Sequence, residues 1–529
     1  MRKFSSYGLI EKKHHYYAPR EELLNRSIQY LTGERSNKDG HYITIWAPRQ
    51  TGKSTLMHQV VQQIKQNENF EVGVISLQSA KNDKTDTDVF KTLLYELSLT
   101  FQKDFKAIQE WKDLSFLFSK KYFEKPLILI IDEFDALEED FINKFANEFR
   151  NMYLRRQNQE STDSAEKSCL LHGLALIGVR SVLGIENVKG SPFNVQRSIH
   201  IPNLTDDEVK YMYQWYEKET KQAIEPEVID RIYDEFRGHP GLTCWFGEIL
   251  TEQYNEETHK PITTENFEIA FAASIFALPN NTILNIISKA KVSPHREVVL
   301  ELFQTKGKQF FSYDDIHLNY LYMNGVIDIQ IENRIEYYAK FSSPFVQKRL
   351  FNYFSRELFR YIGNLTSPFE SIDHVIDDNR IHIKSLMQLY EKYLKKNKDW
   401  LLKDAPTRKD LRIFEAVYHF NLYMFLYHFL LPFKAQIWPE FPTGNGKIDL
   451  IIKYVNQIYG IELKSFSNEK AYQNAIKKCA NYALQLKIKR IALVFFIDAI
   501  DDENRLKFEK IHHDETTDVV VETIFIGTE

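Results

Sequence analysis

Cysteine is scarce in this chain, with three among 529 residues. Cys169, Cys244 and Cys479 lie far apart and show no CxxC spacing, so the sequence contains neither a disulfide framework nor a zinc-binding pattern. We expect all three to be buried thiols.

Long apolar runs are also missing. The longest candidate, around Phe425–Leu431, is interrupted by His428 and falls short of the roughly 20 residues needed to span a bilayer. The opening residues, MRKFSSYGLIEKKHH, lack an apolar signal core and a small-residue cleavage site. These absences predict a cytoplasmic protein with no membrane segment.

No charge of one sign dominates. The formal net charge is -5 and the isoelectric point is near 6.4, which excludes a uniformly basic nucleic-acid-binding protein. Any contact with DNA must therefore come from local basic patches. Apolar residues make up 43% and charged residues 27%, which are globular values, and the length predicts three or four domains.

A phosphate-binding pattern follows a short apolar run near the N-terminus. The segment WAPRQTGKSTLM (Trp46–Met57) fits GxxxxGK(S/T) except that Ala47 replaces the first glycine. Backbone N–H groups at the start of the following helix would hold phosphates, Lys53 would reach the β- and γ-phosphates, and the Ser54 hydroxyl would ligate Mg²⁺. The candidate nucleotide-binding residues of this loop are Ala47, Gln50, Thr51, Gly52, Lys53, Ser54 and Thr55.

A second apolar run supplies the carboxylates that such a site needs. In PLILIIDEFDAL, Leu127–Ile131 reads as a buried parallel strand, and it ends at Asp132 and Glu133. We expect this strand to neighbour the strand of the loop, with Asp132 on the metal side and Glu133 polarising the attacking water. The alternative is that Asp132 and Glu133 cap a helix.

Two later segments extend this unit. The segment Gly173–Ile185 reads as another buried strand followed by a polar position, Arg180, within the same segment. Arg180 is a candidate sensor of the γ-phosphate. Thr205 and Glu208 have the spacing of a helix capping box. In FRGHPGL, the residues Gly238, His239 and Pro240 either line the nucleotide base or form a structural turn.

Together, YYAPREELL, APRQTGKST, LIIDEFDAL and GHPGL resemble the AAA-like ATPases of the STAND and archaeal-ATPase group, over about residues 10–280. The resemblance implies an ASCE-type α/β core at residues 1–200 and a helical lid at 201–280. It implies ATP rather than GTP, since no NKxD-like motif is present. It also implies that Tyr17 and Arg20 lie near the adenine, with surface packing as the alternative.

The middle of the chain, residues 281–365, is predicted to be a winged-helix-like domain. A helix ends at Asn324-Gly325, and Ile327–Ile331 and Ile335–Tyr338 alternate around the turn ENR like a hairpin. The turn carries one cation and one anion, so we favour a packing role over DNA binding. A linker is expected within Thr366–Asn379.

Near the C-terminus, GNGKIDLIIKYVNQIYGIELKSF (Gly444–Phe466) reads as two strands that carry Asp449, Glu462 and Lys464. Burying these charges without partners would be costly, so a divalent metal is expected to compensate them. Asp449 and Glu462 would ligate the metal, and Lys464 would orient the attacking water. The alternative is a salt-bridged hairpin in an inert domain.

This spacing resembles the PD(D/E)xK nuclease superfamily, over roughly residues 380–520. The resemblance implies a restriction-endonuclease-like α/β domain at residues 380–529, and it places a further metal-side acid at Glu415, on a predicted amphipathic helix Asp410–Leu430. Tyr482 matches a recurrent aromatic residue. Ile448 replaces the motif's proline, and Lys477 and Lys478 replace a frequent glutamine.

Basic patches at Lys395–Lys409 and at Lys477, Lys478, Lys487, Lys489 and Arg490 are candidate DNA tracks, and a solvated helix face is the alternative for the first. The sequence thus predicts a multidomain α/β protein in which ATP and Mg²⁺ at the first site gate a Mg²⁺- or Mn²⁺-dependent DNA nuclease, for instance in defence against phage or mobile DNA. The alternatives are an ATP-dependent regulatory or DNA-binding switch that does not cut, and an ATPase of DNA repair or transposition. A second copy of the chain or a regulatory protein is a further candidate partner.

Overall fold

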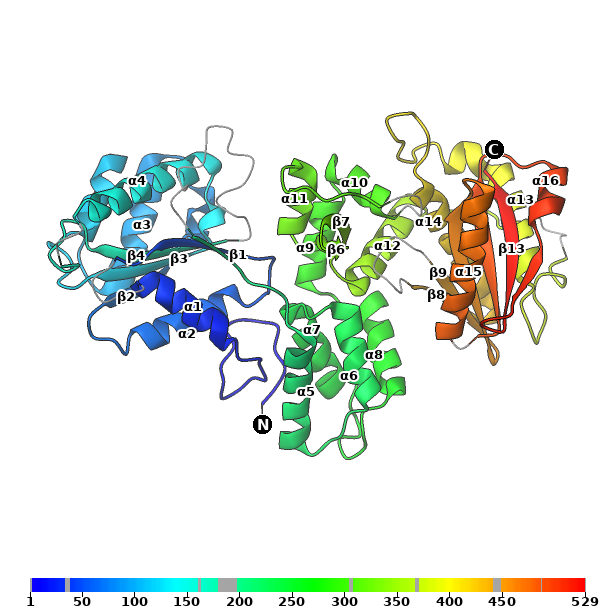
Figure 1. Ribbon diagram of the computed structural model, residues 1–529, viewed down its shortest axis with the longest axis horizontal. Helices are drawn as coiled ribbons and strands as arrows, with labels where there is room; N and C mark the ends of the chain where they lie inside the picture. The colour runs from blue at the N-terminus through cyan, green and yellow to red at the C-terminus, as the bar shows by residue number, and fades with distance from the viewer. Residues whose placement is uncertain are drawn as a thin grey trace. The chain divides into compact units, whose positions relative to one another are not determined.

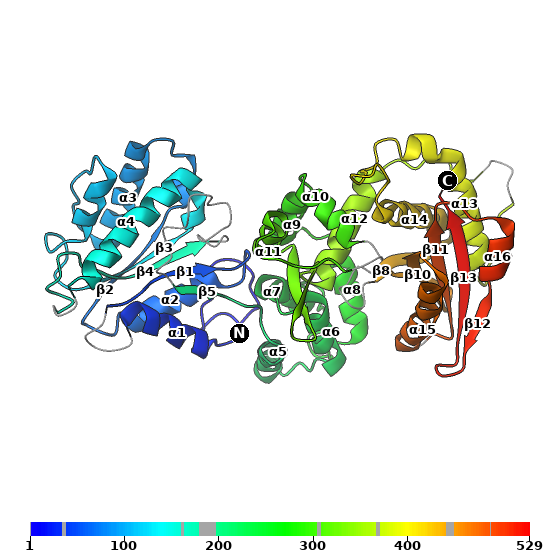
Figure 2. The same cartoon turned by 45° about the horizontal axis from the view of Figure 1, so that its top comes forward.

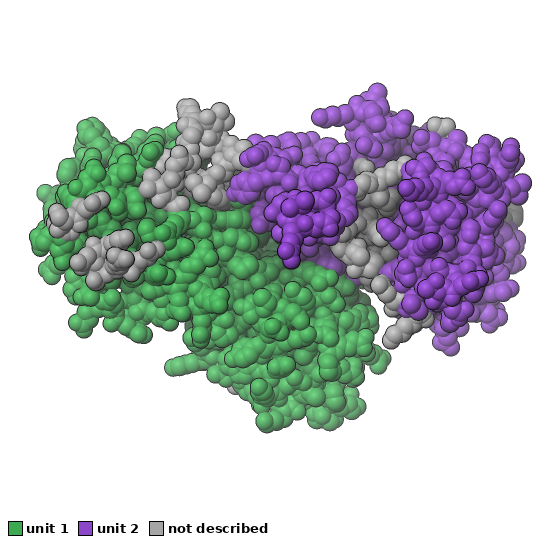
Figure 3. Space-filling view, in the orientation of Figure 1, with its two compact units in different colours: residues 1–282, 323–325 green, residues 283–322, 326–529 purple. Residues whose placement is uncertain are grey.

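The computed structural model describes residues 2–33, 39–159, 163–178, 197–303, 308–366, 371–440, 449–486 and 488–528 (Figure 1). The chain divides into two compact units (Figure 3). The first contains residues 1–282 and 323–325, and the second contains residues 283–322 and 326–529. Each unit is described separately below.

A five-stranded parallel sheet forms the centre of the first unit, in the order β2-β3-β4-β1-β5. Its strands are β1 (Tyr42–Trp46), β2 (Glu71–Ser76), β3 (Leu127–Asp132), β4 (Leu171–Gly178) and β5 (Arg197–His200). The expectation that the loop strand and the acidic strand are neighbours is wrong, because β4 pairs with both β1 and β3 and separates them. This insertion of one strand is the ASCE arrangement that the resemblance implies.

Helices cover both faces of this sheet (Figure 2). On one face, α1 (Glu21–Thr32) and α2 (Lys53–Ile64) form one hydrophobic cluster with β1. On the other, α3 (Asp86–Phe101), α4 (Glu139–Gln157) and the short helix η2 (Trp111–Phe118) form a second cluster. Burial on both faces explains why β3 and β4 are almost continuously apolar.

A helical lid follows the core, and consists of α5 (Asp206–Thr220), α6 (Pro226–Phe236), α7 (Pro240–Glu248) with its π-helical extension Ile249–Gln253, and α8 (Thr264–Phe276). The predicted capping box is confirmed. Thr205 accepts from the Glu208 backbone, and the Glu208 side chain accepts from the Thr205 backbone.

The second unit begins with helices and a two-stranded hairpin. Its first elements are α9 (Asn281–Ala290), whose first two residues belong to the first unit, α10 (His295–Leu302), α11 (Ile316–Met323), β6 (Ile327–Glu332), β7 (Glu336–Phe341) and α12 (Pro344–Leu358). The predicted hairpin is present, with β6 and β7 antiparallel. Asn333 and Arg334 have φ of 49° and 66°, a left-handed pair in the tight turn that the Ile335 N–H closes by donating to Glu332 O.

A six-stranded mixed sheet completes this unit, in the order β12-β13-β11-β10-β9-β8. The strands are β8 (Gln436–Glu440), β9 (Asp449–Tyr454), β10 (Gln457–Ser465), β11 (Arg490–Ile497), β12 (Ile511–Asp514) and β13 (Val519–Gly527). The helices around it are α13 (Ile383–Leu401), α14 (Glu415–Leu430), α15 (Glu469–Gln485) and α16 (Asp502–Phe508).

Consecutive residues of β11 show which helices cover which face, because neighbouring side chains of a strand point to opposite sides. Phe495 contacts Tyr472 of α15. Phe496 contacts Tyr390 of α13 and His419 of α14. The sheet is therefore sandwiched between α15 and the α13–α14 pair.

The prediction of an amphipathic helix from Asp410 is wrong in two respects. Helix α14 begins at Glu415, and most of its length is buried. Its residue Phe420 packs against Phe351 and Phe354 of α12, and the helix also contacts β8. Because other elements cover α14 on several sides, the helix has no continuous polar face.

Within the described residues, no single helix has the length and apolarity to cross a membrane, and one bent pair, α8 with α9, meets both criteria jointly.

A buried ionic cluster joins the loop before β1 to α4 and to the segment before β4. Asp39 accepts from Arg156 and from Lys167, and the side chains of these three residues are 4%, 1% and 5% exposed. Burial disfavours the charged form of Asp39 and so raises its pKa. The attraction of Arg156 and Lys167 is stronger than this effect, and it holds the pKa of Asp39 below its usual value. His172 completes the cluster as a neutral residue, since burial lowers its pKa to about 4.

We expect Asp39→Ala to lower the free energy of unfolding of the first unit by about 3–5 kcal/mol, because two buried cations lose their carboxylate. Urea-induced unfolding measures this loss. The matched control is Glu166→Ala, which breaks the exposed pair with Lys120 and should cost less than about 1 kcal/mol. Equal losses in the two variants would contradict a stabilising role for the buried cluster.

Candidate nucleotide and metal sites

The loop between β1 and α2 has the backbone of a phosphate-binding loop. Gly52 caps α2 with φ of 90°, a conformation that favours glycine. Ala47 is fully buried and belongs to the hydrophobic cluster of α1 and α2. The methyl group at the position of the missing glycine is therefore accommodated in the core.

Lys53 is folded back onto its own loop. Its ammonium donates to Ala47 O at 2.8 Å and to Pro48 O at 2.7 Å. Burial lowers the pKa of Lys53 to about 8, against the opposing effect of Asp135, Asp132 and Glu133. The loop thus holds a poorly solvated cation that an anionic ligand would stabilise.

Ser54 and Asp132 meet although their elements are not adjacent in the sheet. Ser54 Oγ donates to Asp132 Oδ2 at 2.7 Å, and Asp132 Oδ1 accepts from the Glu133 backbone at 2.9 Å. A hydroxyl and a carboxylate side by side are hard oxygen ligands of the kind that Mg²⁺ uses beside phosphates. The donor set therefore fits the magnesium ion expected here.

Glu133 follows Asp132 in a left-handed conformation, with φ of 54°, and its side chain is exposed. Partial desolvation and the nearby Asp135 and Asp132 raise the pKa of Glu133. Asp135 was not predicted as part of the site. It lies against Gly178 at the end of β4 and acts on the charge of Lys53, and its place in the same DEFDAL segment was the only sequence signal.

A cavity opens beside the loop, where the resemblance implies the adenine. Tyr17 and Arg20 both line it, together with Thr51, Gly52, Thr55, Leu204 and Pro240. Arg20 is anchored by donating to Pro202 O at 2.8 Å. The structure therefore brings the N-terminal segment, the loop and the lid around one space.

Of the three turn residues, Pro240 alone lines this cavity. His239 is buried, accepts from the Leu242 backbone at 3.3 Å and has its pKa lowered to about 4 by burial. A Cβ on Gly238 would lie 1.9 Å from Leu204 O. Of the two alternatives for this segment, a structural turn therefore describes Gly238 and His239, which do not line the cavity. Arg180 lies outside the described residues.

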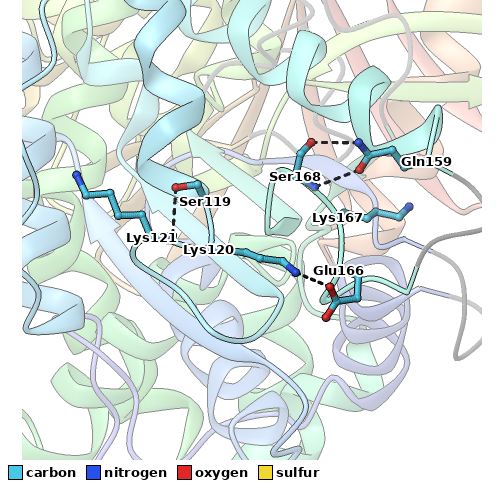
Figure 4. A pocket seen from close by; sticks show the side chains of 7 residues that line it. All are labelled: Ser119, Lys120, Lys121, Gln159, Glu166, Lys167 and Ser168. Atoms are coloured by element: carbon cyan, nitrogen blue, oxygen red, sulfur yellow. Dashed lines mark hydrogen bonds and ion pairs between the residues drawn. The ribbon is translucent and has the colours of Figure 1, made fainter.

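A larger cavity, of about 530 Å³, lies away from these groups (Figure 4). It is at the opposite end of the parallel strands, beside the residues that precede β4. Its polar side chains are already paired, Lys120 with Glu166 and Gln159 with Ser168. It offers no catalytic group comparable to those around Lys53.

In the second unit, Glu462 and Lys464 form a nearly buried ion pair on β10. Lys464 Nζ lies 2.5 Å from Glu462 Oε1, and the side chains are 14% and 3% exposed for Lys464 and Glu462. Among the described residues, Glu462 Oε2 has no hydrogen-bond partner. An orphaned buried carboxylate oxygen fits a cation ligand, because leaving it without one is costly.

Asp449 pairs in antiparallel register with Glu462, so the two predicted ligand positions lie directly opposite each other. The Asp449 side chain falls outside what is described. Glu415 Oε1 lies 3.6 Å from His419 Nε2. His419 contacts Phe496 on the face of the sheet that α13 and α14 cover. Glu462 pairs in register with Leu493, which packs in the α15 cluster. The described contacts therefore group Glu415 with His419 and not with Glu462.

Within the described ranges, no group of three or more His, Cys, Asp or Glu side chains is arranged to hold a metal ion. The proposed basic track is also partly neutralised. Lys489 pairs with Asp518, Arg490 with Glu522 and Lys395 with Glu391. Lys477 and Lys478 are exposed on α15, and Lys487 lies outside the described residues.

Residues 5–259 match the family model of an AAA-like domain. The match supports a P-loop ATPase in the first unit, in agreement with the strand order and the loop geometry. A comparison with curated proteins finds no match.

Among solved structures, the chain is similar to a Walker-type ATPase of Pyrococcus abyssi, with 13% identity, a TM-score of 0.42 and coverage of 66% of this chain and 98% of that one. It is also similar to Cdc6p of Pyrobaculum aerophilum, with 13% identity, a TM-score of 0.37 and coverage of 67% and 97%. The RuvB Holliday junction branch migration motor of Thermotoga maritima gives 13% identity, a TM-score of 0.33 and coverage of 61% and 92%.

We expect ATP binding at pH 8 to be accompanied by uptake of up to about half a proton, because phosphates raise the lowered pKa of Lys53 and complete its protonation. Calorimetry in two buffers of different ionisation enthalpy measures the uptake. Lys53→Arg is the control, since arginine stays charged and should take up no proton at this position. Equal uptake in both proteins would contradict the assignment to Lys53.

Proposed function

We propose that the first unit binds and hydrolyses ATP with Mg²⁺, and that this site gates a metal-dependent nuclease in the second unit. The contact that carries the ATPase proposal is the 2.7 Å hydrogen bond between Ser54 and Asp132, beside the half-buried side chain of Lys53. These groups supply one cation for the phosphates and two oxygen ligands for the metal.

Each residue would contribute a separate part of the reaction. Lys53 would leave Ala47 O and Pro48 O to bind phosphate oxygens, while N–H groups at the start of α2 bind further oxygens. Mg²⁺ bound at Ser54 and Asp132 would offset the charge that develops on the transferred phosphoryl group. Glu133, exposed at the end of β3, would accept the proton of the attacking water, and its raised pKa makes it a stronger base than an ordinary carboxylate.

A nuclease is supported by a separate observation, the buried Glu462–Lys464 pair opposite position Asp449. Glu462 Oε2 and Asp449 would hold a Mg²⁺ or Mn²⁺ ion, which supplies a nucleophilic hydroxide and charge neutralisation when bound. Lys464, already within reach of Glu462, would orient the water and stabilise the phosphodiester oxygen. We propose DNA as the substrate and defence against phage or mobile DNA as the role.

The competing proposal is an ATP-dependent switch that does not cut. Lys489 and Arg490 are paired with acidic residues, which weakens the basic patch as a DNA-binding surface. This pairing favours the switch over the nuclease. Metal binding and cleavage distinguish the two proposals.

We expect Lys53→Ala to abolish ATP binding and Glu133→Gln to retain ATP while reducing the turnover number by about 10²–10⁴-fold, since only the second change leaves the phosphate contacts intact. Equilibrium binding of labelled ATP and phosphate release measure the two effects. Normal hydrolysis in Lys53→Ala would refute the loop assignment. Normal hydrolysis in Glu133→Gln would remove Glu133 from water activation.

For the second site, we expect Mg²⁺- or Mn²⁺-dependent cleavage of supercoiled and linear DNA that is lost in Lys464→Ala. Lys453→Ala, which changes an exposed lysine of β9 that belongs to neither basic patch, is the matched control and should retain cleavage. The assay is run with and without ATP to measure coupling. Metal binding without cleavage under any condition would favour the switch, and cleavage that survives Lys464→Ala would refute the site.

A further inference from the structure

The phosphate-binding loop makes three specific contacts through Gln50 and Pro48. Gln50 O accepts from the Gly241 backbone of the lid at 2.9 Å. Gln50 Oε1 accepts a short hydrogen bond from the Thr282 hydroxyl. Pro48 packs so closely on Gly325 that a Cβ there would lie 2.9 Å from Pro48 Cβ.

Two of these contacts occur where the chain passes between its units. Thr282 is the last residue of the first segment of unit one, and Gly325 ends the short return 323–325. Both residues belong to the first unit, and each is followed directly by a residue of the second. The loop that would bind phosphates thus contacts two of the points at which the chain leaves the first unit.

Gln50 is held in an uncommon conformation. Its φ is 56°, which costs on the order of 1 kcal/mol for a residue other than glycine. Thr282 is 3% exposed, so its hydroxyl has no ready exchange with bulk water. The bond from Thr282 therefore fixes the Gln50 side chain while Gly241 fixes its backbone.

Lys53 links this arrangement to the ligand. In this structure its ammonium holds the carbonyls of Ala47 and Pro48, and phosphates would compete for the same donor. Release of Pro48 O would free the segment that contacts Gly325, and Gln50 lies two residues further along.

We propose that Thr282 is a positioning residue that, through Gln50, transmits nucleotide occupancy of the loop to the chain crossings, and so biases the arrangement of the second unit. This inference rests on the proposed ATP site. The inference assigns the coupling between the loop and the second unit to the hydrogen bond from Thr282 to Gln50. The inference can therefore be refuted even if the chain binds ATP as proposed.

The test follows the distance between the two units in the full chain. Spin labels are placed on Tyr95→Cys and Leu506→Cys, which replace side chains 63% and 80% exposed, while the native cysteines are buried. Distances are measured with and without Mg²⁺ and a non-hydrolysable ATP analogue, in the otherwise unchanged chain and in Thr282→Val. Thr251→Val is the matched control, because Thr251 is a buried lid threonine whose hydroxyl donates to Gly247 O, within the lid, at 2.7 Å.

We expect the analogue to shift the population of distances in the unchanged chain and in Thr251→Val. In Thr282→Val the shift in the population ratio should be about fivefold smaller, the factor that corresponds to losing about 1 kcal/mol of hydrogen bonding. Affinity for the analogue is measured in parallel, and Thr282→Ser should restore the shift because it restores the hydroxyl.

An equal shift in Thr282→Val would overturn the inference and leave the ATP site standing. So would a chain that binds the analogue with no shift at all. Failure of the unchanged chain to bind the analogue would overturn the proposed ATP site and this inference together.

Discussion

The common carboxyl edge of the parallel strands is the constraint on which the candidate site of the first unit depends, and the hydrogen bond between Ser54 and Asp132 is formed there. The two residues lie on elements separated by β4, so they meet only if three parallel strands end at the same edge of the sheet. Continuous burial of β3 and β4 under helices on both faces fixes that edge. The charges of Lys53, Glu133 and Asp135 then gather at one place, where an anionic ligand and a divalent cation would compensate them.

Local pattern was sufficient for features that local chemistry determines. The loop from β1 into α2, the acidic end of β3, the capping box at Thr205 and the hairpin β6–β7 were all visible in the sequence, because glycine, capping residues and alternation act over a few residues. Tertiary contacts decided the rest. These features all depend on parts of the chain distant in the sequence: the position of β4 between β1 and β3, the burial of His239, the role of Asp135 and the burial of α14.

The second unit shows the same limit at its candidate site. The ExK spacing placed Glu462 and Lys464 on one face of β10, and the structure shows them paired and nearly buried. Spacing did not reveal that Asp518 and Glu522, about 30 residues downstream of Lys489 and Arg490, would pair with those cations. Among the residues that the structure describes, Glu462 Oε2 has no hydrogen-bond partner, which costs stability unless a ligand compensates it. The proposed metal site therefore depends on this buried acid more than on the basic surface.

The most direct test of the account is the position of a Mn²⁺ ion, located by its anomalous scattering in crystals of the chain with a non-hydrolysable ATP analogue. The account predicts manganese bound at Ser54 and Asp132, with the Lys53 ammonium moved from Ala47 O and Pro48 O onto the phosphates. A nucleotide bound elsewhere, or a Lys53 that keeps both carbonyl bonds while the analogue is present, would contradict it.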